Sequence, residues 1–304
     1  MYDIIGDIHG QAAMLRKLLE KMNYSSHEGI YSHPDGRKAV FIGDFINRGP
    51  EIRETIRLIR AMVDHGHAYA ILGNHEVNAI LFSILNKKGK HINKKWSRLR
   101  FDLGLTFREF APYPDEWESH LNWFRHLPLF LDFGSVRVVH ACWQDQNICL
   151  LKNQLNGMSK LRKSFLKEIL KKSSPTAAAF WRTCKGIDFQ LPDDLLIFDE
   201  SGCAHRSFRS RWWENPEGMT FKELSFESRF QLPAYSIPPE LNMRREAYPS
   251  NAPLVFFGHY CITDRPNILK SNICCLDSCV SRRGKLTAYR WNGELELKKE
   301  NLIS

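Results

Sequence analysis

Residues 2–10, with the sequence Tyr-Asp-Ile-Ile-Gly-Asp-Ile-His-Gly, decide how the rest of this chain is interpreted. The apolar run 2–5 predicts a buried strand, and Asp7 and His9 follow it immediately. The same order, an apolar run and then a polar block, returns four more times. The later runs are 39–42, 68–72, 136–139 and 254–257, and their polar blocks are 43–49, 73–76, 139–140 and 258–259. Because ligands of open α/β sheets gather where strands end and loops begin, we expect the five blocks to meet at one edge of a sheet.

These blocks offer carboxylate, imidazole and amide groups that could bind metal ions. The six candidate ligands are Asp7, His9, Asp44, Asn74, His140 and His259. Mixed oxygen and nitrogen ligands suit transition metals better than Mg²⁺ or Ca²⁺. We therefore expect two divalent ions, with Mn²⁺ first and Fe or Zn²⁺ as alternatives. Asp44 is the candidate bridge, because one carboxylate can hold two cations about 3.5–4 Å apart.

A pair of metals would allow hydrolysis of a phosphate ester by a hydroxide that bridges them. Arg48, four residues after Asp44, could hold phosphate oxygens in a bidentate fork, and Asn74 could contact the phosphate as well. His75 could donate a proton to the leaving group. Glu76 is expected to begin a helix rather than to bind metal, because the helix dipole favours a carboxylate there.

The pattern between the blocks predicts one domain with helices between the strands. Apolar residues at helical spacing predict helices at 11–22 and 51–63, and Asn292-Gly293 predicts a hairpin that joins strands at 285–291 and 294–298. Since the blocks extend from Asp7 to His259, we expect a single domain over 1–304. An insertion at about 143–253, placed over the metal site, would then select the substrate.

Composition is that of an ordinary globular protein, with 304 residues, 43% hydrophobic and 25% charged. No apolar run is long enough to span a bilayer, and the N-terminus does not resemble a secretory signal, so we expect a cytoplasmic protein without a membrane partner. The eight cysteines are irregularly spaced. Free thiols are therefore expected rather than a disulfide framework.

A formal net charge of +9 favours an anionic substrate such as a nucleotide, RNA or a phosphoprotein. Part of the excess lies in the stretches 87–100 and 152–172. A nucleic-acid partner rests on these basic runs alone, and they lack interleaved aromatic platforms. We favour the simpler interpretation that they form solvated faces of helices.

The combination GDxHG, GDxxNRG, GNHE and two later histidines resembles the phosphoprotein phosphatase branch of the calcineurin-like metallophosphoesterases. The compact size of the chain and its segment Leu276-Asp277-Ser278-Cys279 resemble those of bacterial members. These members include symmetrical dinucleoside-tetraphosphate hydrolases and small bacterial and phage protein phosphatases. The resemblance implies an α/β fold (α+β by some schemes), with a central β-sandwich flanked by helices and a di-metal site at the C-terminal ends of strands. It implies ligand roles for the six candidates, phosphate binding by Arg48 and general-acid catalysis by His75. It also implies a second phosphate-binding arginine, for which Arg209 and Arg211 are the candidates.

One position departs from the family pattern. The family has an aspartate where this chain has Asn47, and that carboxylate orients the acid histidine. Asn47 can still accept a hydrogen bond from a ring N–H of His75, but it carries no charge to stabilise an imidazolium. We therefore expect a lower pKa for His75 than in relatives with the aspartate, and weaker general-acid catalysis.

Three functions remain open from the sequence. The first is a metallophosphoesterase that cleaves phosphate esters, acting on phosphomonoesters or, like serine/threonine phosphatases, on phosphoproteins. The second is a dinucleoside-polyphosphate hydrolase, whose anhydride leaving group needs little protonation and so suits Asn47. The third is a non-catalytic interaction module with the same fold, against which the complete set of ligands, Arg48 and His75 argues.

Overall fold

The computed structural model describes residues 1–193, 195–199, 202–226, 230, 232, 235–241, 246–262, 267–282 and 284–304. The chain divides into two compact units, Met1–Cys184 with Pro253–Ser304, and Lys185–Ala252. The second unit lies inside the segment 143–253 that the sequence marks as an insertion, whereas 143–184 belongs to the first unit. Among the described residues, none of the helices is both long and apolar enough to cross a membrane.

The first sheet carries three of the predicted strands side by side. Its strand order is β16-β15-β1-β4-β5. The central strands β1, β4 and β5 are parallel, and β15 and β16 add antiparallel strands at one edge. The bounds are β1 (Tyr2–Ile5), β4 (Lys38–Phe41), β5 (Ala68–Ala70), β15 (Ala288–Trp291) and β16 (Leu302–Ile303). The parallel strands therefore deliver the loops that follow them to the same end of the sheet.

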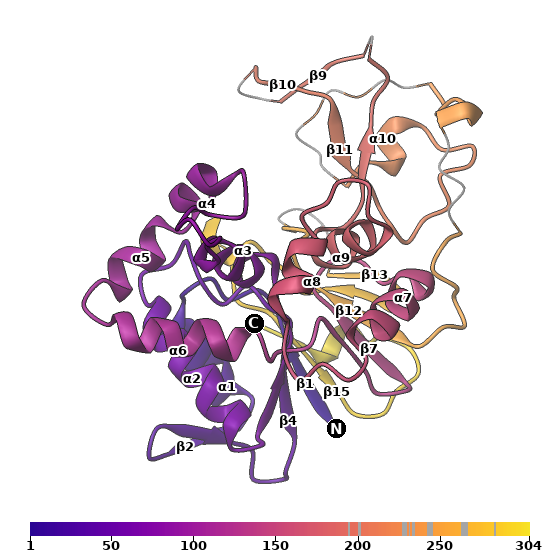
Figure 1. Cartoon of the computed structure of the whole chain (residues 1–304). Coiled ribbons are helices and arrows are strands. Elements are labelled where there is room, and N and C mark those ends of the chain that lie inside the picture. The colour runs from indigo at the N-terminus through magenta and orange to yellow at the C-terminus, as the bar shows by residue number, and fades with distance from the viewer. Residues whose placement is uncertain are drawn as a thin grey trace. The chain divides into compact units, whose positions relative to one another are not determined.

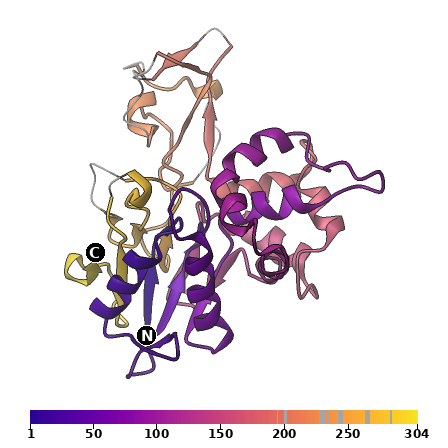
Figure 2. The same ribbon diagram turned by 90° about the vertical axis from the view of Figure 1, so that its left-hand side faces the viewer.

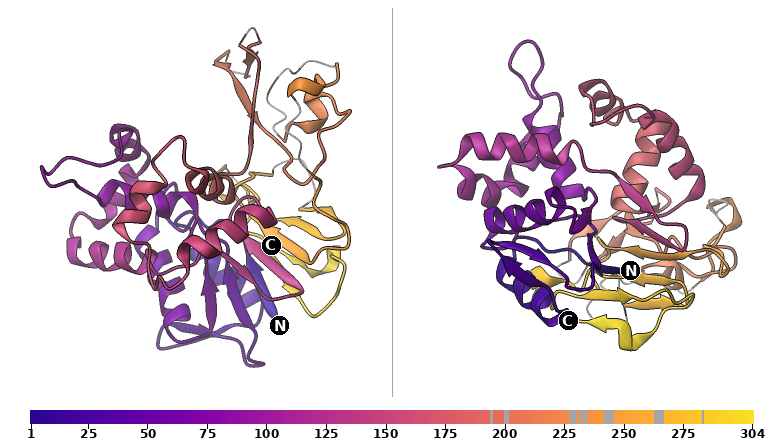
Figure 3. Two further views of the ribbon diagram at one scale, coloured as in Figure 1. Left: turned by 45° about the vertical axis from the view of Figure 1, so that its right-hand side comes forward. Right: turned by 90° about the horizontal axis from the view of Figure 1, so that it is seen from below.

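The second sheet carries the other two predicted strands, in the order β13-β14-β12-β7-β6. Strand β12 is parallel to both β7 and β14, and the edge strands β6 and β13 are antiparallel to their neighbours. The bounds are β6 (Phe130–Asp132), β7 (Val136–Val139), β12 (Leu254–Phe257), β13 (Ile268–Lys270) and β14 (Ile273–Cys275). In Figure 3 (left), the pink and orange-yellow strands of this sheet lie beside the violet strands of the first.

Alternation along the strands explains why the two sheets form a sandwich. Side chains of successive strand residues point to opposite faces. Ile4 and Val40 belong to an apolar cluster that also contains Val138 and Phe256 from the second sheet. The neighbouring residue Phe41 packs instead into the cluster formed with the helices. The predicted central β-sandwich flanked by helices is thereby confirmed.

Helices cover the sandwich and contribute most of the larger apolar cluster. Helices α1 and α2 connect β1 to β4 and β4 to β5, as the helical stripes predict, with the short hairpin β2–β3 inserted after α1 (Figure 1). The group α3–α6 and the group α7–α9, purple and pink in Figure 2, lie side by side. The bounds are α1 (Ala12–Lys21), β2 (Ser25–His27), β3 (Ile30–Ser32), α2 (Ile52–Asp64), α3 (Asn74–Ser83), α4 (Trp96–Asp102), α5 (Gly104–Phe110), α6 (Pro114–Phe124), α7 (Asp145–Leu155), α8 (Lys163–Glu168) and α9 (Pro175–Lys185), followed late in the chain by the 3₁₀ turns η2 (Val280–Arg282) and η3 (Lys299–Asn301).

The second unit has a small apolar core of its own, which includes Phe189, Phe208 and Phe221. This unit has two short antiparallel pairs, β8 with β11 and β9 with β10, and β8, β9 and β11 contribute residues to the core. The bounds are β8 (Asp188–Gln190), β9 (Ile197–Phe198), β10 (Ala204–His205), β11 (Ser207–Arg209), α10 (Phe221–Leu224) and η1 (Pro239–Leu241).

Two expectations about local structure are wrong. Cys261 and Cys279 form a disulfide, whereas the other six cysteines are free thiols as expected. Residues 294–298 are not a strand, and β15 pairs instead with β16. The reason is local, because the Glu294 carboxylate accepts hydrogen bonds from the Asn292 backbone N–H (2.8 Å) and the Tyr289 hydroxyl (2.7 Å).

Candidate active site

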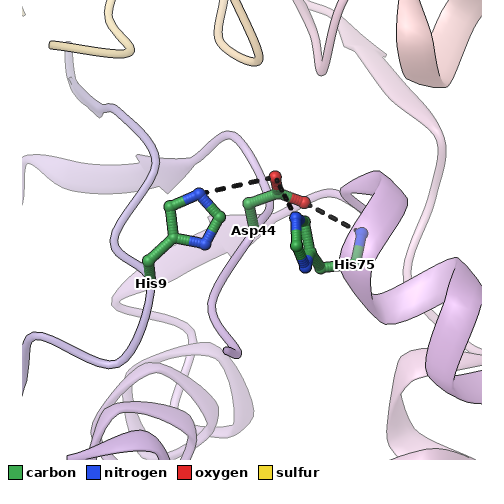
Figure 4. Close-up of side chains that lie close together, drawn as sticks. All are labelled: His9, Asp44 and His75. Atoms are coloured by element: carbon green, nitrogen blue, oxygen red, sulfur yellow. Dashed lines mark hydrogen bonds and ion pairs between the residues drawn. The ribbon is translucent and has the colours of Figure 1, made fainter. Parts of the chain in front are cut away.

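Asp44 lies at the centre of the polar residues that follow the parallel strands. Its Oδ2 atom is 3.7 Å from His9 Nε2 and 3.8 Å from His75 Nε2, and its Oδ1 atom is 3.4 Å from His140 Nε2. Oδ1 also accepts a hydrogen bond of 3.0 Å from the backbone N–H of His75. Figure 4 shows the His9 and His75 rings on either side of the Asp44 carboxylate. Residues that follow β1, β5 and β7 thus converge on the carboxylate of Asp44, which follows β4.

Unusual backbone angles aim these side chains. Five residues of the loops have a positive φ, which costs an L-residue about 1–2 kcal/mol. They are His9 (48°), Asp44 (54°), Asn47 (68°), Arg48 (65°) and His259 (63°). Backbone hydrogen bonds brace the first two turns, since the N–H groups of Ile8 and His9 both donate to the Asp44 carbonyl. The strain is therefore concentrated where the functional side chains leave the backbone.

Glu76 braces the same loops, a role that the sequence did not reveal. It is fully buried and its carboxylate accepts four backbone hydrogen bonds, from Asp44 (2.9 Å), Phe45 (2.8 Å), Ile46 (3.2 Å) and Gly73 (3.0 Å). Burial raises the pKa of Glu76 to about 7. Its predicted position at the start of a helix is correct, because α3 begins at Asn74. The additional role is to hold the loop that carries Asp44.

Asp7 and His259 approach each other from different sheets. The backbone N–H of His259 donates to Asp7 Oδ2 at 3.0 Å. Gly258 allows this approach, because a Cβ atom there would lie 1.9 Å from Asp7 Oδ1. Within the described part of the chain, Asp7 Oδ1 is buried and has no hydrogen-bond partner. Burial and the neighbouring Asp277 carboxylate raise the pKa of Asp7 well above its ordinary value.

His140 is fully buried and presents Nε2 to the centre of the site. Its Nδ1 atom lies 2.7 Å from the carbonyl oxygen of Ile42, to which it can donate. Nε2 lies 3.1 Å from Asn74 Oδ1. Burial acts to lower the pKa of His140, but the carboxylates of Asp44 and Asp7 outweigh it and raise that pKa to about 10. The two carboxylates therefore favour positive charge at the position of this ring.

His9 faces Asp44 from the opposite side. Its Nδ1 atom lies 3.1 Å from the Ile46 carbonyl oxygen, and its Nε2 atom lies 3.1 Å from Arg48 Nη1. Burial lowers the pKa of His9 to about 3, although the Asp44 carboxylate opposes this shift. The ring is therefore neutral, and its Nε2 atom, which accepts from Arg48 Nη1, is the candidate ligand atom.

Asn47 contacts His75 as predicted, but with the opposite polarity. Its Nδ2 atom lies 2.6 Å from His75 Nδ1, whereas we expected its oxygen to face the ring. The oxygen is already occupied, because the Thr106 hydroxyl donates to Asn47 Oδ1 at 2.5 Å. Burial lowers the pKa of His75, and the nearby Arg48 lowers it further, while Asp44 opposes both. Thr106 is thus a second residue that the sequence did not mark.

Comparison with known proteins agrees with this geometry. A family model described as calcineurin-like phosphoesterase matches residues 2–262. The chain belongs to the calcineurin-like phosphoesterase family. It is 47% identical over 154 residues to an asymmetrical bis(5'-nucleosyl)-tetraphosphatase PrpE of Halalkalibacterium halodurans, an alignment that covers 48% of this phosphoesterase and 59% of the relative. It is 48% identical over 146 residues to the enzyme of the same name from Geobacillus thermodenitrificans, covering 46% and 56%.

The phosphoesterase spans little more than half the length of these curated relatives. They are named as asymmetrical enzymes, rather than the symmetrical hydrolases named above for bacterial members of the family. A solved structure of a cold-active protein-tyrosine phosphatase from a psychrophilic Shewanella species covers 95% of this chain and 74% of its own, with 16% identity and a TM-score of 0.46.

The side chains of the phosphoesterase fit a pair of divalent ions. One group of potential ligand atoms comes from His9, Asp44 and His75, and a second from Asp44, His140 and His259, with the atoms of each group within 4.8 Å of one another. Asp44 belongs to both groups, as a bridging ligand would. The buried Asp7 Oδ1 atom, which has no hydrogen-bond partner among the described residues, is a further candidate oxygen ligand. These donors are the nitrogen and oxygen atoms that Mn²⁺, Fe and Zn²⁺ accept.

Arg48 belongs to the first unit, whereas Arg209 and Arg211, the other candidates for phosphate binding, belong to the second. Arg48 is exposed, and its guanidinium contacts the rings of both His9 and His75. Its Nη1 atom lies 3.1 Å from His9 Nε2, and its Nη2 atom lies 3.4 Å from His75 Nε2. Arg209 ends β11 opposite Asp188, and Arg211 donates from Nε to the Ser225 carbonyl oxygen at 3.2 Å. Both lie in the second unit. Their part in phosphate binding stays a prediction.

Proposed function

We propose that this phosphoesterase hydrolyses the phosphoanhydride of a nucleoside polyphosphate, such as a dinucleoside tetraphosphate. Asp7, His9, Asp44, Asn74, His140 and His259 would hold two divalent ions, with manganese as the ion that we expect. When bound, such ions supply an activated water and neutralise phosphate charge. Arg48 would hold a phosphate oxygen from the solvent side, and His75 would face the leaving group.

The observation that carries this proposal is the contact between Asn47 and His75. An amide N–H occupies the position beside Nδ1, so no carboxylate there stabilises an imidazolium. Burial lowers the pKa of His75 in the same direction. A neutral ring can donate a hydrogen bond but transfers a proton poorly. A polyphosphate leaves as a stable anion and needs little protonation, whereas an alkoxide needs a full proton.

Similarity to proteins named bis(5'-nucleosyl)-tetraphosphatase supports the same substrate class. The exposed position of Arg48 and the net charge of +9 also suit a polyanion. A cytoplasmic location, where nucleotides are abundant, remains part of the proposal.

Phosphate esters, including phosphoproteins, are the second candidate class. The Asp44 carboxylate lies 3.8 Å from His75 Nε2 and acts to raise the pKa of His75. If this attraction dominated, His75 would be charged at neutral pH and would serve an ester leaving group.

A substrate panel with the full chain separates the two classes. Diadenosine tetraphosphate, a phosphoserine peptide and p-nitrophenyl phosphate are compared at equal concentrations of Mn²⁺, Fe²⁺ and Zn²⁺, with Asp44→Asn as the blank. We expect the highest kcat/KM for diadenosine tetraphosphate with Mn²⁺. A higher kcat/KM for the phosphopeptide in every metal would overturn the proposal.

A further inference from the structure

A disulfide joins two segments that both contact the candidate metal site. Cys261, in the loop after β12, is bonded to Cys279, which follows β14. The two strands are parallel neighbours, so the segments after them leave the sheet at the same edge. His259, a candidate metal ligand, lies two residues before Cys261. The cross-link is therefore attached to the loop that carries this ligand.

The segment of Cys279 contacts the site at two further points. Asp277 is buried, and its carboxylate adds to the effect of burial in raising the pKa of Asp7. Ser281 Oγ lies 3.4 Å from Arg48 Nη1. The Cys279 backbone between them has a positive φ of 56°, and its N–H donates to Asp277 Oδ1 at 3.0 Å. Movement of this segment would therefore be felt by a candidate ligand and by the candidate phosphate-binding arginine.

The two bonded cysteines differ in their access to solvent. Cys261 is partly exposed, whereas Cys279 is only 2% exposed. A thiol reductant could therefore reach the bond from the side of Cys261. Among the free thiols, Cys149 and Cys203 are exposed and the other four are buried. Burial raises the pKa of the Cys274 thiol on β14, so its reactive thiolate is scarce. A reductant in solvent would thus act on the disulfide rather than on the buried thiols beside it.

Stability alone does not account for a cross-link in this domain. Disulfides are dense in small secreted domains, because the cores of such domains are too small to hold the fold. The first unit instead contains two large apolar clusters. In a cytoplasmic protein, the location proposed above, thiols are kept reduced, and a disulfide is usually transient and catalytic or redox-sensing.

We propose that Cys261 and Cys279 form a redox-sensitive site that adjusts metal binding, with the disulfide as the tighter-binding form and the dithiol as the weaker one. This inference rests on the proposed function, because it assigns a regulatory device to the same metal site. Two sulfur atoms that are not bonded cannot lie as close together as two that are. Reduction therefore lets the His259 loop and the Cys279 segment move apart, and His259 loses its fixed position.

The reaction partner is a dithiol reductant, which supplies two electrons and two protons. One thiolate of the reductant bonds to the Cys261 sulfur, the disulfide bond breaks, and Cys279 leaves with the electron pair and takes up a proton. The second thiolate of the reductant then displaces Cys261, which takes up the other proton. The protein gains two thiols, and the reductant ends as its own disulfide.

Manganese binding by the full chain in its two redox forms tests this site without relying on turnover. The protein is reduced with dithiothreitol, which is removed under anaerobic conditions before calorimetry because it binds metals. Alkylation of the unfolded chain should count six thiols before reduction and eight after it. We expect the reduced form to bind manganese about tenfold more weakly, the cost typical of losing a contact that orients a ligand. Reoxidation with oxidised glutathione should restore the affinity.

Two variants assign the effect to this pair. Cys261→Ser removes the cross-link and should bind manganese as weakly as the reduced wild type, with or without reductant. Cys149→Ser is the matched control, because Cys149 is an exposed free thiol on α7. It should respond to reduction as the wild type does.

Equal manganese affinity in the two redox forms, or no binding in either, would refute the proposal. A response to reduction that persists in Cys261→Ser refutes it as well, as does unfolding of the reduced wild type in circular dichroism. A disulfide that stays oxidised at every ratio of reduced to oxidised glutathione is structural, which also counts against a switch. The function proposed above fails separately, through a preference for the phosphopeptide in the substrate panel, and that result leaves the difference in manganese affinity standing.

Discussion

Replacement of Glu76 by glutamine tests whether one buried carboxylate holds the loop that carries Asp44. Oε1 accepts from the N–H groups of Phe45 and Ile46, and Oε2 accepts from those of Asp44 and Gly73. Glutamine has nearly the same shape but only one acceptor oxygen. Two of the four backbone N–H groups would then face an amide NH₂ group, which cannot accept from them.

The expected loss of stability follows from those two orphaned donors. A buried donor without a partner costs about 1–3 kcal/mol, so two cost about 2–6 kcal/mol. Part of this loss is offset, because burial of a neutral amide costs less free energy than burial of a carboxylate. Burial of the Glu76 carboxylate is also what raises its pKa to about 7. We expect a net loss of about 2–4 kcal/mol. Displacement of the Asp44 loop should also reduce the manganese bound per chain.

The assay combines urea unfolding with measurement of bound manganese. Glu109→Gln is the control, because the Glu109 carboxylate also accepts two backbone N–H groups, from Ile52 (2.9 Å) and Arg53 (2.8 Å), but at the start of α2 and partly exposed. It should lose about 1 kcal/mol and keep its manganese. If Glu76→Gln lost no more stability than this control and bound manganese normally, the bracing role of Glu76 would be wrong.

Three further changes probe the metal site, the acid and the surface charges. Asp44→Asn should lower bound manganese from two ions per chain to fewer than one, measured by atomic emission, and retention of both ions contradicts the bridging role. Asn47→Asp should raise the ratio of kcat for an alkyl phosphate to kcat for an anhydride about tenfold, because a carboxylate raises the pKa of His75 and increases its protonated fraction. An unchanged ratio counts against the role of Asn47. Burial acts to raise the pKa of Glu116, but hydrogen bonds from Arg57 and Arg53 outweigh it and hold that pKa at about 2. The stabilisation is therefore complete above the ordinary pKa of 4.5 and is lost as pH falls towards 2, so the gap of about 1 kcal/mol between wild type and Glu116→Gln should close over that range in urea unfolding. A gap that does not depend on pH would contradict this.

The sandwich and the convergence of the loops were predictable because both follow from local pattern. The parallel strands are buried on both faces, so they appear in the sequence as short continuous apolar runs. Each run is followed directly by a glycine or by a candidate ligand. Parallel strands bring the segments that follow them to the same edge of the sheet. Asp44 and His140 are 96 positions apart in the chain, yet each could be assigned from the run that precedes it.

The roles of Glu76, Thr106 and the disulfide were not predictable in this way. Glu76 acts on residues of another loop, 30–32 positions earlier in the chain. Thr106 belongs to no motif, and its contact with Asn47 depends on how α5 packs. Cys261 and Cys279 meet because their segments follow the neighbouring parallel strands β12 and β14. Each of these contacts depends on tertiary packing, which spacing along the chain does not encode.

Substrate preference in this phosphoesterase should depend on residues that surround the candidate metal ligands rather than on those ligands themselves. A site built from Asp44 and the histidines can serve any phosphate substrate, because the ions act on the phosphoryl group alone. The leaving group differs between esters and anhydrides, and in the proposed mechanism it would depart past His75. The orientation of the Asn47 amide is set there by Thr106, which belongs to α5. Substitutions at Asn47 and Thr106 should therefore change which substrate is preferred while leaving metal binding intact.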